Sequence, residues 1–419
     1  MVNLNNSFVQ NIDRRFNSAM EKLNSQHHIP PTWAVCLIGA LGLAVAMGIG
    51  RFAFTPLLPL MRHEGLIDAG GGAWLAAANY LGYLLGALSA AWLPGSPRIQ
   101  VLGSLLLTAV LTTSIAVVPS LAGWMVLRLA AGMASAWTLV AISSWAVSTL
   151  AQRQRSDASG WVFAGVGLGI AVAGGLTWWH AEAGASALWR ELGWLALGLA
   201  AVAGLLWRKA DSAVPARPAH AAAPAHAAAA LPGHSTALVL CYGTLGFGYI
   251  LPATYLPALA QELMHDPDRF GLVWPVFGTA AACSTLLAGY ALRRWHGRRI
   301  WAASHAAMAA GCALPLFSHS GWAVTMAALL VGGTFMVATM TGLQQARNCA
   351  PANPKPLLGR MTAAFALGQI AGPLLVLVLR HLPPAPFGLT SITLAQSFAV
   401  VALLGSAHWL YRSLHYLEK

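Results

Sequence analysis

The chain has 419 residues, of which 57% are hydrophobic and only 9% are charged. A soluble domain carries about 25% charged residues, so this chain has too few charges to cover a water-exposed surface. The composition excludes a soluble protein and predicts an integral membrane protein.

Residues 1–32 precede the first apolar stretch and contain no apolar core of a cleavable signal peptide. Apolar residues recur there near helical spacing, beside basic ones. Two interpretations stay open: an amphipathic helix lying on the inner leaflet, and a disordered tail. The apolar positions are Phe8, Ile12, Phe16, Met20 and Leu23.

The rest of the chain consists mainly of long apolar stretches. A membrane helix needs about 20 mostly apolar residues, and these stretches are continuous rather than alternating, which excludes a porin-like barrel. We predict an all-α membrane protein with twelve transmembrane helices. The expected spans are 33–61, 73–93, 99–118, 121–150, 159–180, 187–207, 237–263, 271–292, 300–317, 321–347, 358–381 and 388–411.

The net charge of +12 is explained by membrane topology. If the N-terminus is cytoplasmic, 18 of the 24 basic residues fall on the cytoplasmic side and four on the opposite side. This asymmetry follows the positive-inside rule, so we expect both termini in the cytoplasm and the protein in a bacterial inner membrane. A nucleic-acid partner is not needed to explain the charge.

A linker rich in Ala, Pro and His, residues 208–236, divides the spans into two groups of six. The halves are residues 33–207 and 237–411, and a short cytoplasmic tail, 412–419, follows. The linker histidines have no Cys or carboxylate cluster near them, and the five cysteines form no CxxC pair. We therefore expect no metal, disulfide framework or cofactor.

The halves also repeat each other in sequence. Residues 48–59 align without gaps on residues 246–257, and two glycines and the final proline coincide. In this alignment Tyr249 is the counterpart of Arg51. Transporters built from parallel repeats show such internal symmetry.

Several motifs resemble the major facilitator superfamily. Helix 4 carries Arg128 followed by Gly132, and helices 5 and 11 carry paired glycines. The stretches 48–61 and 359–373 look like the YbfB/YjiJ-type branch of that superfamily. The residues that carry these motifs, apart from Arg128, are Gly165, Gly169, Gly368, Gly372, Pro373 and the basic loop residues Arg293, Arg294, Arg298 and Arg299.

The resemblance implies two six-helix bundles and assigns packing and gating roles. Paired small residues let membrane helices approach closely, so the glycines are expected to join the two halves, helix 5 on helix 8 and helix 11 on helix 2. The basic loop is expected to belong to a cytoplasmic gate. Arg293 stands where the family has an acid, and the corresponding loop after helix 2, residues 93–98, has neither the acid nor paired basic residues. The resemblance therefore implies a latch that is weak or differently built. Four helix-1 residues are expected to bend that helix, with ligand binding left open: Gly48, Gly50, Pro56 and Pro59.

Two arginines, Arg51 and Arg128, lie deep inside expected spans, where charge is costly and usually functional. In the resembling fold, helices 1 and 4 line the central cavity, so both arginines could bind an anionic solute. The alternative is that they donate to backbone carbonyls and brace a bend. Other polar span residues that could complete a substrate site are Asn79, Tyr83, Tyr249, Tyr255 and Gln369.

The energy source is constrained by what the sequence lacks. It contains no phosphate-binding GxxxxGK[ST] motif and no HExxH motif, so an ATP-driven pump and a zinc protease are excluded and the protein is not expected to be an enzyme. All twelve acids fall outside the span interiors. Proton coupling would have to use Glu262, a histidine such as His305, or the ionisation of the substrate itself, and it stays open.

We therefore predict a monomeric secondary transporter in the lipid bilayer, which moves a small organic solute by rocking its two halves. An anionic or carboxylate-bearing solute is favoured by the arginines. The alternatives are a transporter-like receptor, and efflux of neutral or amphiphilic drugs or metabolites. A channel would show rings of like residues, and the sequence shows none.

Overall fold

The computed structural model describes residues 30–212, 232–263, 272–318, 320–380 and 390–415, and all regular structure in these ranges is helical. The predicted amphipathic segment and the middle of the linker lie outside them. The first half comprises α2 (Thr32–Leu43), η1 (Ala44–Phe52), α3 (Phe54–His63), α4 (Ala69–Ser89), η2 (Ala90–Trp92), α5 (Pro97–Ile115), α6 (Leu121–Ile142), η3 (Ser143–Val147), α7 (Ser148–Gln152), η4 (Ser156–Ala158), α8 (Ser159–Trp179), η5 (Ala181–Ala183) and α9 (Ala185–Ser212). The second half comprises α10 (Pro232–Leu263), α12 (Val273–Ala291), α13 (Gly297–Phe317), α14 (Gly321–Cys349), α15 (Lys355–Arg380) and α16 (Ser391–His415).

Within the described ranges, eleven helical stretches are long and apolar enough to span a membrane. The first joins α2, η1 and α3 into one span. The remaining predicted span, 73–93, forms α4 and η2; α4 is 21 residues long, but its glycines, Asn79 and its two tyrosines lower its hydropathy. The predicted fold class, an all-α membrane protein, is confirmed.

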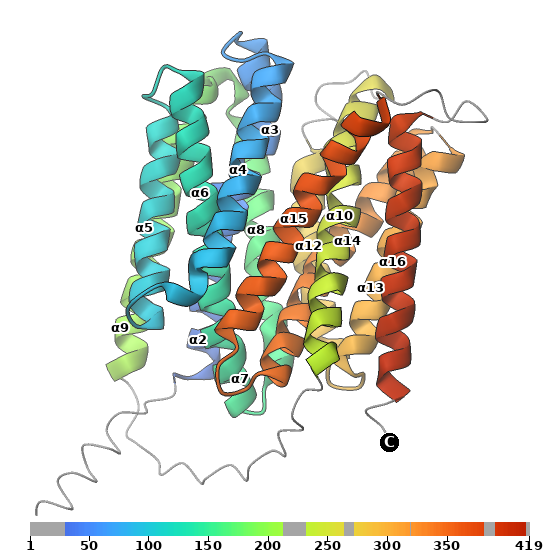
Figure 1. Ribbon diagram of the computed structural model, residues 1–419. Coiled ribbons are helices and arrows are strands. Elements are labelled where there is room, and N and C mark those ends of the chain that lie inside the picture. The colour runs from blue at the N-terminus through green and yellow to red at the C-terminus, as the bar shows by residue number, and fades with distance from the viewer. Residues whose placement is uncertain (1–29, 213–231, 264–271, 319, 381–389, 416–419) are drawn as a thin grey trace, which may run out of the picture.

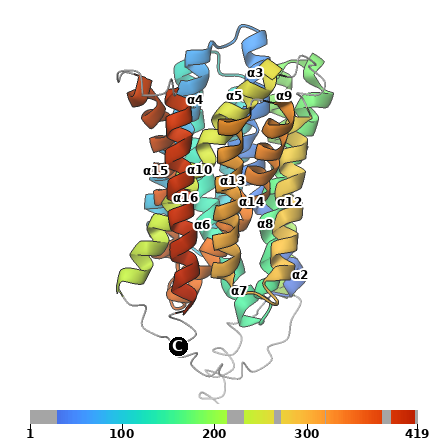
Figure 2. The ribbon, with the colours of Figure 1, turned by 90° about the vertical axis from the view of Figure 1, so that its right-hand side faces the viewer.

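The two halves form two bundles that stand side by side (Figure 1). In Figure 2 the helices α16 and α13 of the second half run next to one another over the height of the molecule, and α14 packs on both α13 and α12. The halves meet chiefly where α8 packs on α12 and where α4 packs on α15. We call the end where α2 begins and α16 ends the terminal end, and the opposite end the distal end.

Exposed tryptophans gather near both ends of the bundle. Such rings favour the two membrane–water interfaces, so they mark where the bilayer boundaries lie. Between the two sets of tryptophans, the exposed side chains of the helices are mainly aliphatic, as in the hydrocarbon part of a bilayer. These tryptophans include Trp33, Trp92 and Trp295 at the terminal end, and Trp74, Trp179 and Trp322 at the distal end.

In the first half, the glycines of the helix-5 motif pack inside the half. A Cβ on Gly169 would lie 2.8 Å from the Ala44 Cα, and one on Gly165 would meet the Ala40 backbone. The expectation that this pair joins helix 5 to helix 8 is therefore wrong, because both glycines face helix 1. The α8–α12 contact exists, but it runs through Gly167, whose Cβ would lie 2.5 Å from the Gly278 carbonyl oxygen.

The second half repeats this arrangement. Gly368 faces the backbone of α10 at Gly243, and Gly372 faces the Ile250 side chain of the same helix. These two glycines also pack within their half, contrary to the expected contact with helix 2. The contact of α15 with α4 is made at Gly359, where a Cβ would lie 2.8 Å from the Ala87 carbonyl oxygen. Pro373 lies inside α15.

Candidate functional site

Helix 1 changes from an α-helix to a π-helix over η1, the segment that carries the predicted bend. Side chains of α6 bind its carbonyl groups: Arg128 Nη1 donates to the Gly50 oxygen at 3.1 Å, and Ser135 Oγ donates to the Ala46 oxygen at 2.6 Å. Short π segments inside helices are common at functional sites. The predicted prolines follow the segment, since Pro56 lies in the first turn of α3 and Pro59 inside it.

Arg128 is therefore engaged with the backbone of helix 1. Its Nη2 also donates to the Arg51 carbonyl oxygen at 3.3 Å, so both terminal nitrogens are used. This geometry matches the alternative that the sequence left open for Arg128, a brace at a bend. Gly48 and Gly50 lie in the same π segment, where Gly48 contacts the backbone of Gly169 and a Cβ on Gly50 would lie 2.5 Å from the Thr108 methyl carbon.

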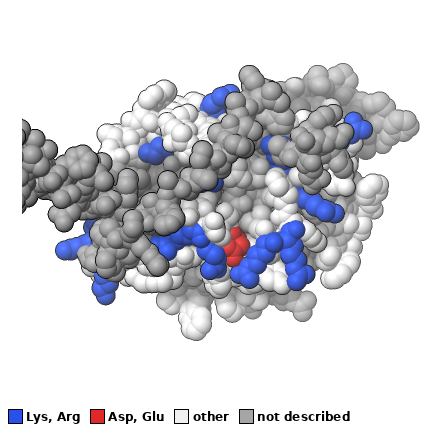
Figure 3. Space-filling view, turned by 90° about the horizontal axis from the view of Figure 1, so that it is seen from below, with Lys and Arg blue, Asp and Glu red and all other residues white. Residues whose placement is uncertain are grey.

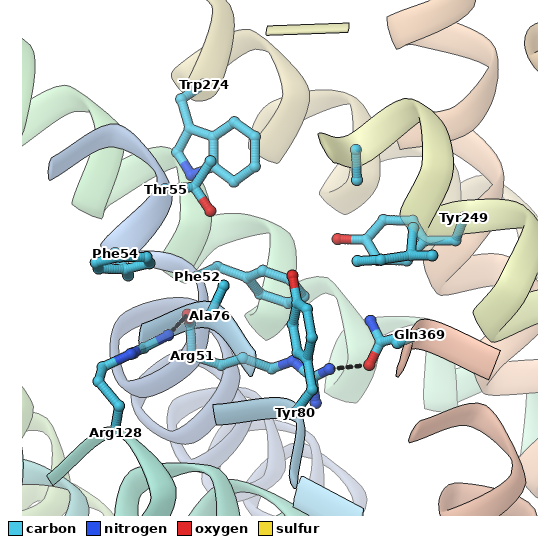
Figure 4. Close-up of a pocket in the computed structure, with 12 residues that line it drawn as sticks. Arg51, Phe52, Phe54, Thr55, Ala76, Tyr80, Arg128, Tyr249, Trp274 and Gln369 are labelled. Atoms are coloured by element: carbon cyan, nitrogen blue, oxygen red, sulfur yellow. Dashed lines mark hydrogen bonds between the residues drawn. The ribbon is translucent and has the colours of Figure 1, made fainter. Parts of the chain in front are cut away.

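Arg51 leaves the π segment toward the second half (Figure 4). Its side chain is buried, with 3% exposed, and its Nη2 donates to Oε1 of Gln369 on α15. The guanidinium carbon lies 3.7 Å from the centroid of the Tyr83 ring, within cation–π range. Tyr83 thus covers one face of a planar cation whose edge points to the other half of the protein.

A cavity of about 40 Å³ lies beside Arg51, between the two halves. That volume holds roughly two or three water molecules, so an organic solute would have to widen it. The first half contributes Arg51, Phe52, Phe54, Thr55, Ala76, Tyr80 and Arg128, and the second half contributes Tyr249, Ile250, Ala253, Trp274 and Gln369.

Several residues that line this cavity carry N–H donors. Four of the lining residues bury N–H groups that have no acceptor within the described protein. A buried donor without an acceptor costs about 1–3 kcal/mol, so the cavity is suited to a group that accepts hydrogen bonds. No carboxylate lines it among the described residues. The donor atoms are Arg51 Nε and Nη1, Arg128 Nε, Trp274 Nε1 and Gln369 Nε2.

The structure brings several predicted site residues together and separates others. Tyr249 and Gln369 line the cavity, and Tyr83 lies behind Arg51. Asn79 does not line it, because its amide donates to the Arg128 carbonyl oxygen at 3.0 Å and joins α4 to α6. The side chain of Tyr255 lies outside the described residues.

Sequence reasoning missed several aromatic residues that line the cavity. Tyr80 lies between Asn79 and Tyr83, which were predicted as site residues. Its place on the same helical turn was the sequence signal that could have identified it. Phe52 and Phe54 flank the π segment. Trp274 lies at the distal end of α12, and its ring nitrogen marks it as a polar group inside a span.

The basic loop after α12 makes contacts at the terminal end. Arg293 donates through Nε to Asp157 Oδ2 at 3.0 Å, which forms an ion pair between the halves. Arg298 is buried and donates to Gln345 at 3.4 Å within the second half. Arg294 and Arg299 are exposed, and the Arg299 guanidinium lies over the Trp295 ring.

A second contact between the halves at this end joins Lys355 Nζ to Gln100 Oε1 at 2.7 Å. Figure 3 views this end and shows Lys and Arg spread over it, with acidic atoms near the middle. Neither Asp157 nor Lys355 was predicted from the sequence as a gate residue. The sequence signal for the Asp157–Arg293 pair was an acid just before helix 5, on the side of the membrane where the basic loop is also expected.

A family model described as "Uncharacterised MFS-type transporter YbfB" matches residues 43–405. The chain belongs to this family. The predicted membership of the major facilitator superfamily and of its YbfB-like branch is thereby confirmed, and the protein is a multi-pass membrane transporter of the secondary type for small molecules. No match was found among curated proteins.

Proposed function

We propose that this YbfB-family transporter moves a small organic solute with an anionic group by alternating access. The observation that carries the proposal is Arg51, a buried cation with two unpartnered nitrogens at a cavity between the halves. A guanidinium edge binds a carboxylate through two parallel hydrogen bonds, and in Arg51 either such edge also uses Nη2, which the carboxylate would take over from Gln369. Because the cavity lies between the rocking halves, its two walls would separate and rejoin during transport.

The contacts at the terminal end support a state closed on that side. Arg293 pairs with Asp157, and Gln344 donates to the Ser156 carbonyl oxygen at 3.1 Å. Both contacts join the second half to the start of α8. Rocking toward the opposite state would break them and open a path from the cavity to the terminal end.

We further propose that the terminal end faces the cytoplasm of a bacterial cell, because the basic residues gather there. Cys349 lies at this end, where α14 finishes. In a variant that keeps Cys349 as the sole cysteine, an impermeant thiol reagent should label inverted vesicles and leave intact cells unlabelled. Labelling of intact cells would reverse the topology.

The assigned role of Arg51 is tested by the binding of benzoate and acetate to the purified full-length protein, measured by calorimetry and by the shift of the melting temperature. A ligand that binds the folded state raises its melting temperature. Arg51→Gln should abolish binding, and Arg51→Lys should weaken it about tenfold or more, because an ammonium lacks the planar fork. Arg294→Gln, which removes an exposed arginine away from the cavity, is the control and should bind as the wild type does.

The melting temperature without ligand separates binding from folding. If Arg51→Gln folds and still binds both carboxylates with wild-type affinity, the anionic site is refuted. Uptake into proteoliposomes by the wild type, and its loss in Arg51→Gln, would establish transport rather than sensing.

A further inference from the structure

The wall of the cavity in the second half is part of a continuous stack of aromatic rings. Tyr249 of α10 stacks on Phe335 of α14, with ring centroids 4.9 Å apart and planes 19° apart. Phe335 stacks on Phe277 at 5.4 Å, and Phe277 stacks on Trp274 at 5.1 Å with planes 3° apart. Helices α10, α12 and α14 thus hold these rings in one orientation, and both ends of the stack, Tyr249 and Trp274, line the cavity.

The first half faces this wall with one cation and further rings. Phe52, Phe54 and Tyr80 line its side of the cavity beside Arg51. Figure 4 shows Tyr249 and Trp274 in the second half, across the cavity from Phe52 and Arg51. The cavity therefore offers hydrogen-bond donors from both halves, with ring faces and edges around them.

The number of available charges limits the ligand to one anionic group. Both terminal nitrogens of Arg128 are used by backbone carbonyls, whereas Arg51 has two nitrogens without an acceptor and a third bound to the neutral side-chain oxygen of Gln369. An ammonium group would meet the like charge of Arg51, and none of the described lining residues carries a carboxylate that would balance a second positive charge. Amino-acid zwitterions and organic cations are disfavoured for this reason.

We propose that the solute is an aromatic monocarboxylate. Its carboxylate would replace Gln369 as the acceptor for Arg51, and its ring would lie against Tyr249 and Trp274. The inference rests on the anionic solute proposed above and narrows its class. A cavity of about 150 Å³ takes up benzene, so the space of about 40 Å³ has to widen. Loss of the Arg51–Gln369 bond, which links the two halves, allows that widening.

The first test compares four probes against the wild-type protein in detergent: benzoate, cyclohexanecarboxylate, acetate and benzamide. Benzoate should bind about tenfold tighter than cyclohexanecarboxylate, because stacking contributes beyond buried area, and tighter still than acetate. Benzamide has the ring without the charge and should not bind. Equal affinity for benzoate and cyclohexanecarboxylate would overturn the aromatic assignment while leaving the anionic site intact. If no carboxylate binds, the anionic site itself fails.

The second test uses variants of the wall. Trp274→Leu should lower the affinity for benzoate about three- to tenfold and leave acetate binding unchanged, whereas Trp274→Phe, which keeps a ring, should retain most of the preference. The matched control is Trp145→Leu, which removes a ring stacked on Trp207 at 4.2 Å, away from the cavity. An unchanged benzoate-to-acetate ratio in Trp274→Leu would refute the role of the wall.

Discussion

The two halves of this transporter share their packing and differ in their chemistry. In the first half, Gly48 of helix 1 lies against the backbone of Gly169 on helix 5. In the second half, Gly368 of helix 11 lies in the same way against the α10 backbone at Gly243 and Phe247. At the centre, Arg51 of the first half corresponds to Tyr249 of the second. Repeated glycines preserve the close helix contacts of both halves. At the matched central position, the first half has the cation Arg51 and the second half has Tyr249, a ring of the aromatic wall.

The same comparison explains why only one of the two helices is distorted. Arg128 and Ser135 of α6 supply donors to the carbonyls of η1. At the same offset of 198 residues the second half has Met326 and Gly333, which have no side-chain donor, and α10 is α-helical throughout. A π segment survives in a membrane where neighbouring side chains satisfy its backbone groups.

The largest expected effect tests the shared packing. Gly169→Leu should destabilise the protein by about 3 kcal/mol or more, because its side chain meets the backbone of helix 1. Gly372→Leu should cost less, since the nearest atom is a methyl carbon of Ile250, which can change rotamer. The measurement is the melting temperature in detergent, with Gly198→Leu as the control because nothing lies within 4 Å of its Cβ. Equal melting temperatures for all three would show that these glycines do not set the packing.

The next effect tests the distorted helix. Arg128→Gln should lower the free energy of unfolding by about 2 kcal/mol, because the carbonyls of Gly50 and Arg51 lose their donors inside the membrane. It should also weaken benzoate binding, since these carbonyls flank the Arg51 side chain. The control is Met326→Gln at the matched position of the second half. If Arg128→Gln keeps the wild-type stability and loses only binding, Arg128 contacts the solute directly, as the sequence analysis considered.

The sequence was sufficient for the family and the fold class, since these depend on motifs and apolar runs. It also singled out Arg51 as a charge inside a span, and the role of Arg51 stays a prediction. It could not identify the partner of each glycine, because spacing defines a helix face and not the helix that covers it. The π segment depends on donors from α6, and the ring stack gathers residues far apart in the chain. His305, considered for proton coupling, lies in the second half, where it accepts from Trp301 at 2.9 Å and contacts Ser406.

The smallest effect concerns the gate, where each half contributes one charged residue at the terminal end. Asp157 lies in η4, directly before helix 5 of the first half, and Lys355 begins helix 11 of the second. Asp157 pairs with Arg293, whereas Lys355 donates to the neutral Gln100. The resembling family has its acid in the loop after helix 8, at the position of Arg293. Here the acid is Asp157, before helix 5, and the basic Arg293 in the loop is its partner.

Breaking the Asp157–Arg293 ion pair should shift the equilibrium from the state closed at the terminal end toward the state open there, with little loss of folding stability. Arg293 is 57% exposed, so the pair contributes only about 0–1 kcal/mol after solvent screening. Asp157→Asn should therefore raise the accessibility of the terminal side of the cavity by a few-fold at most, as measured by the labelling rate of a cysteine placed there. The exchange variant Asp157→Arg with Arg293→Asp should restore the wild-type rate, whereas Arg294→Asp combined with Asp157→Arg should not. If the exchange variant labels as fast as Asp157→Asn, contact between these two charges does not hold the terminal end closed, and the uncharged contacts of Gln344 and Lys355 do.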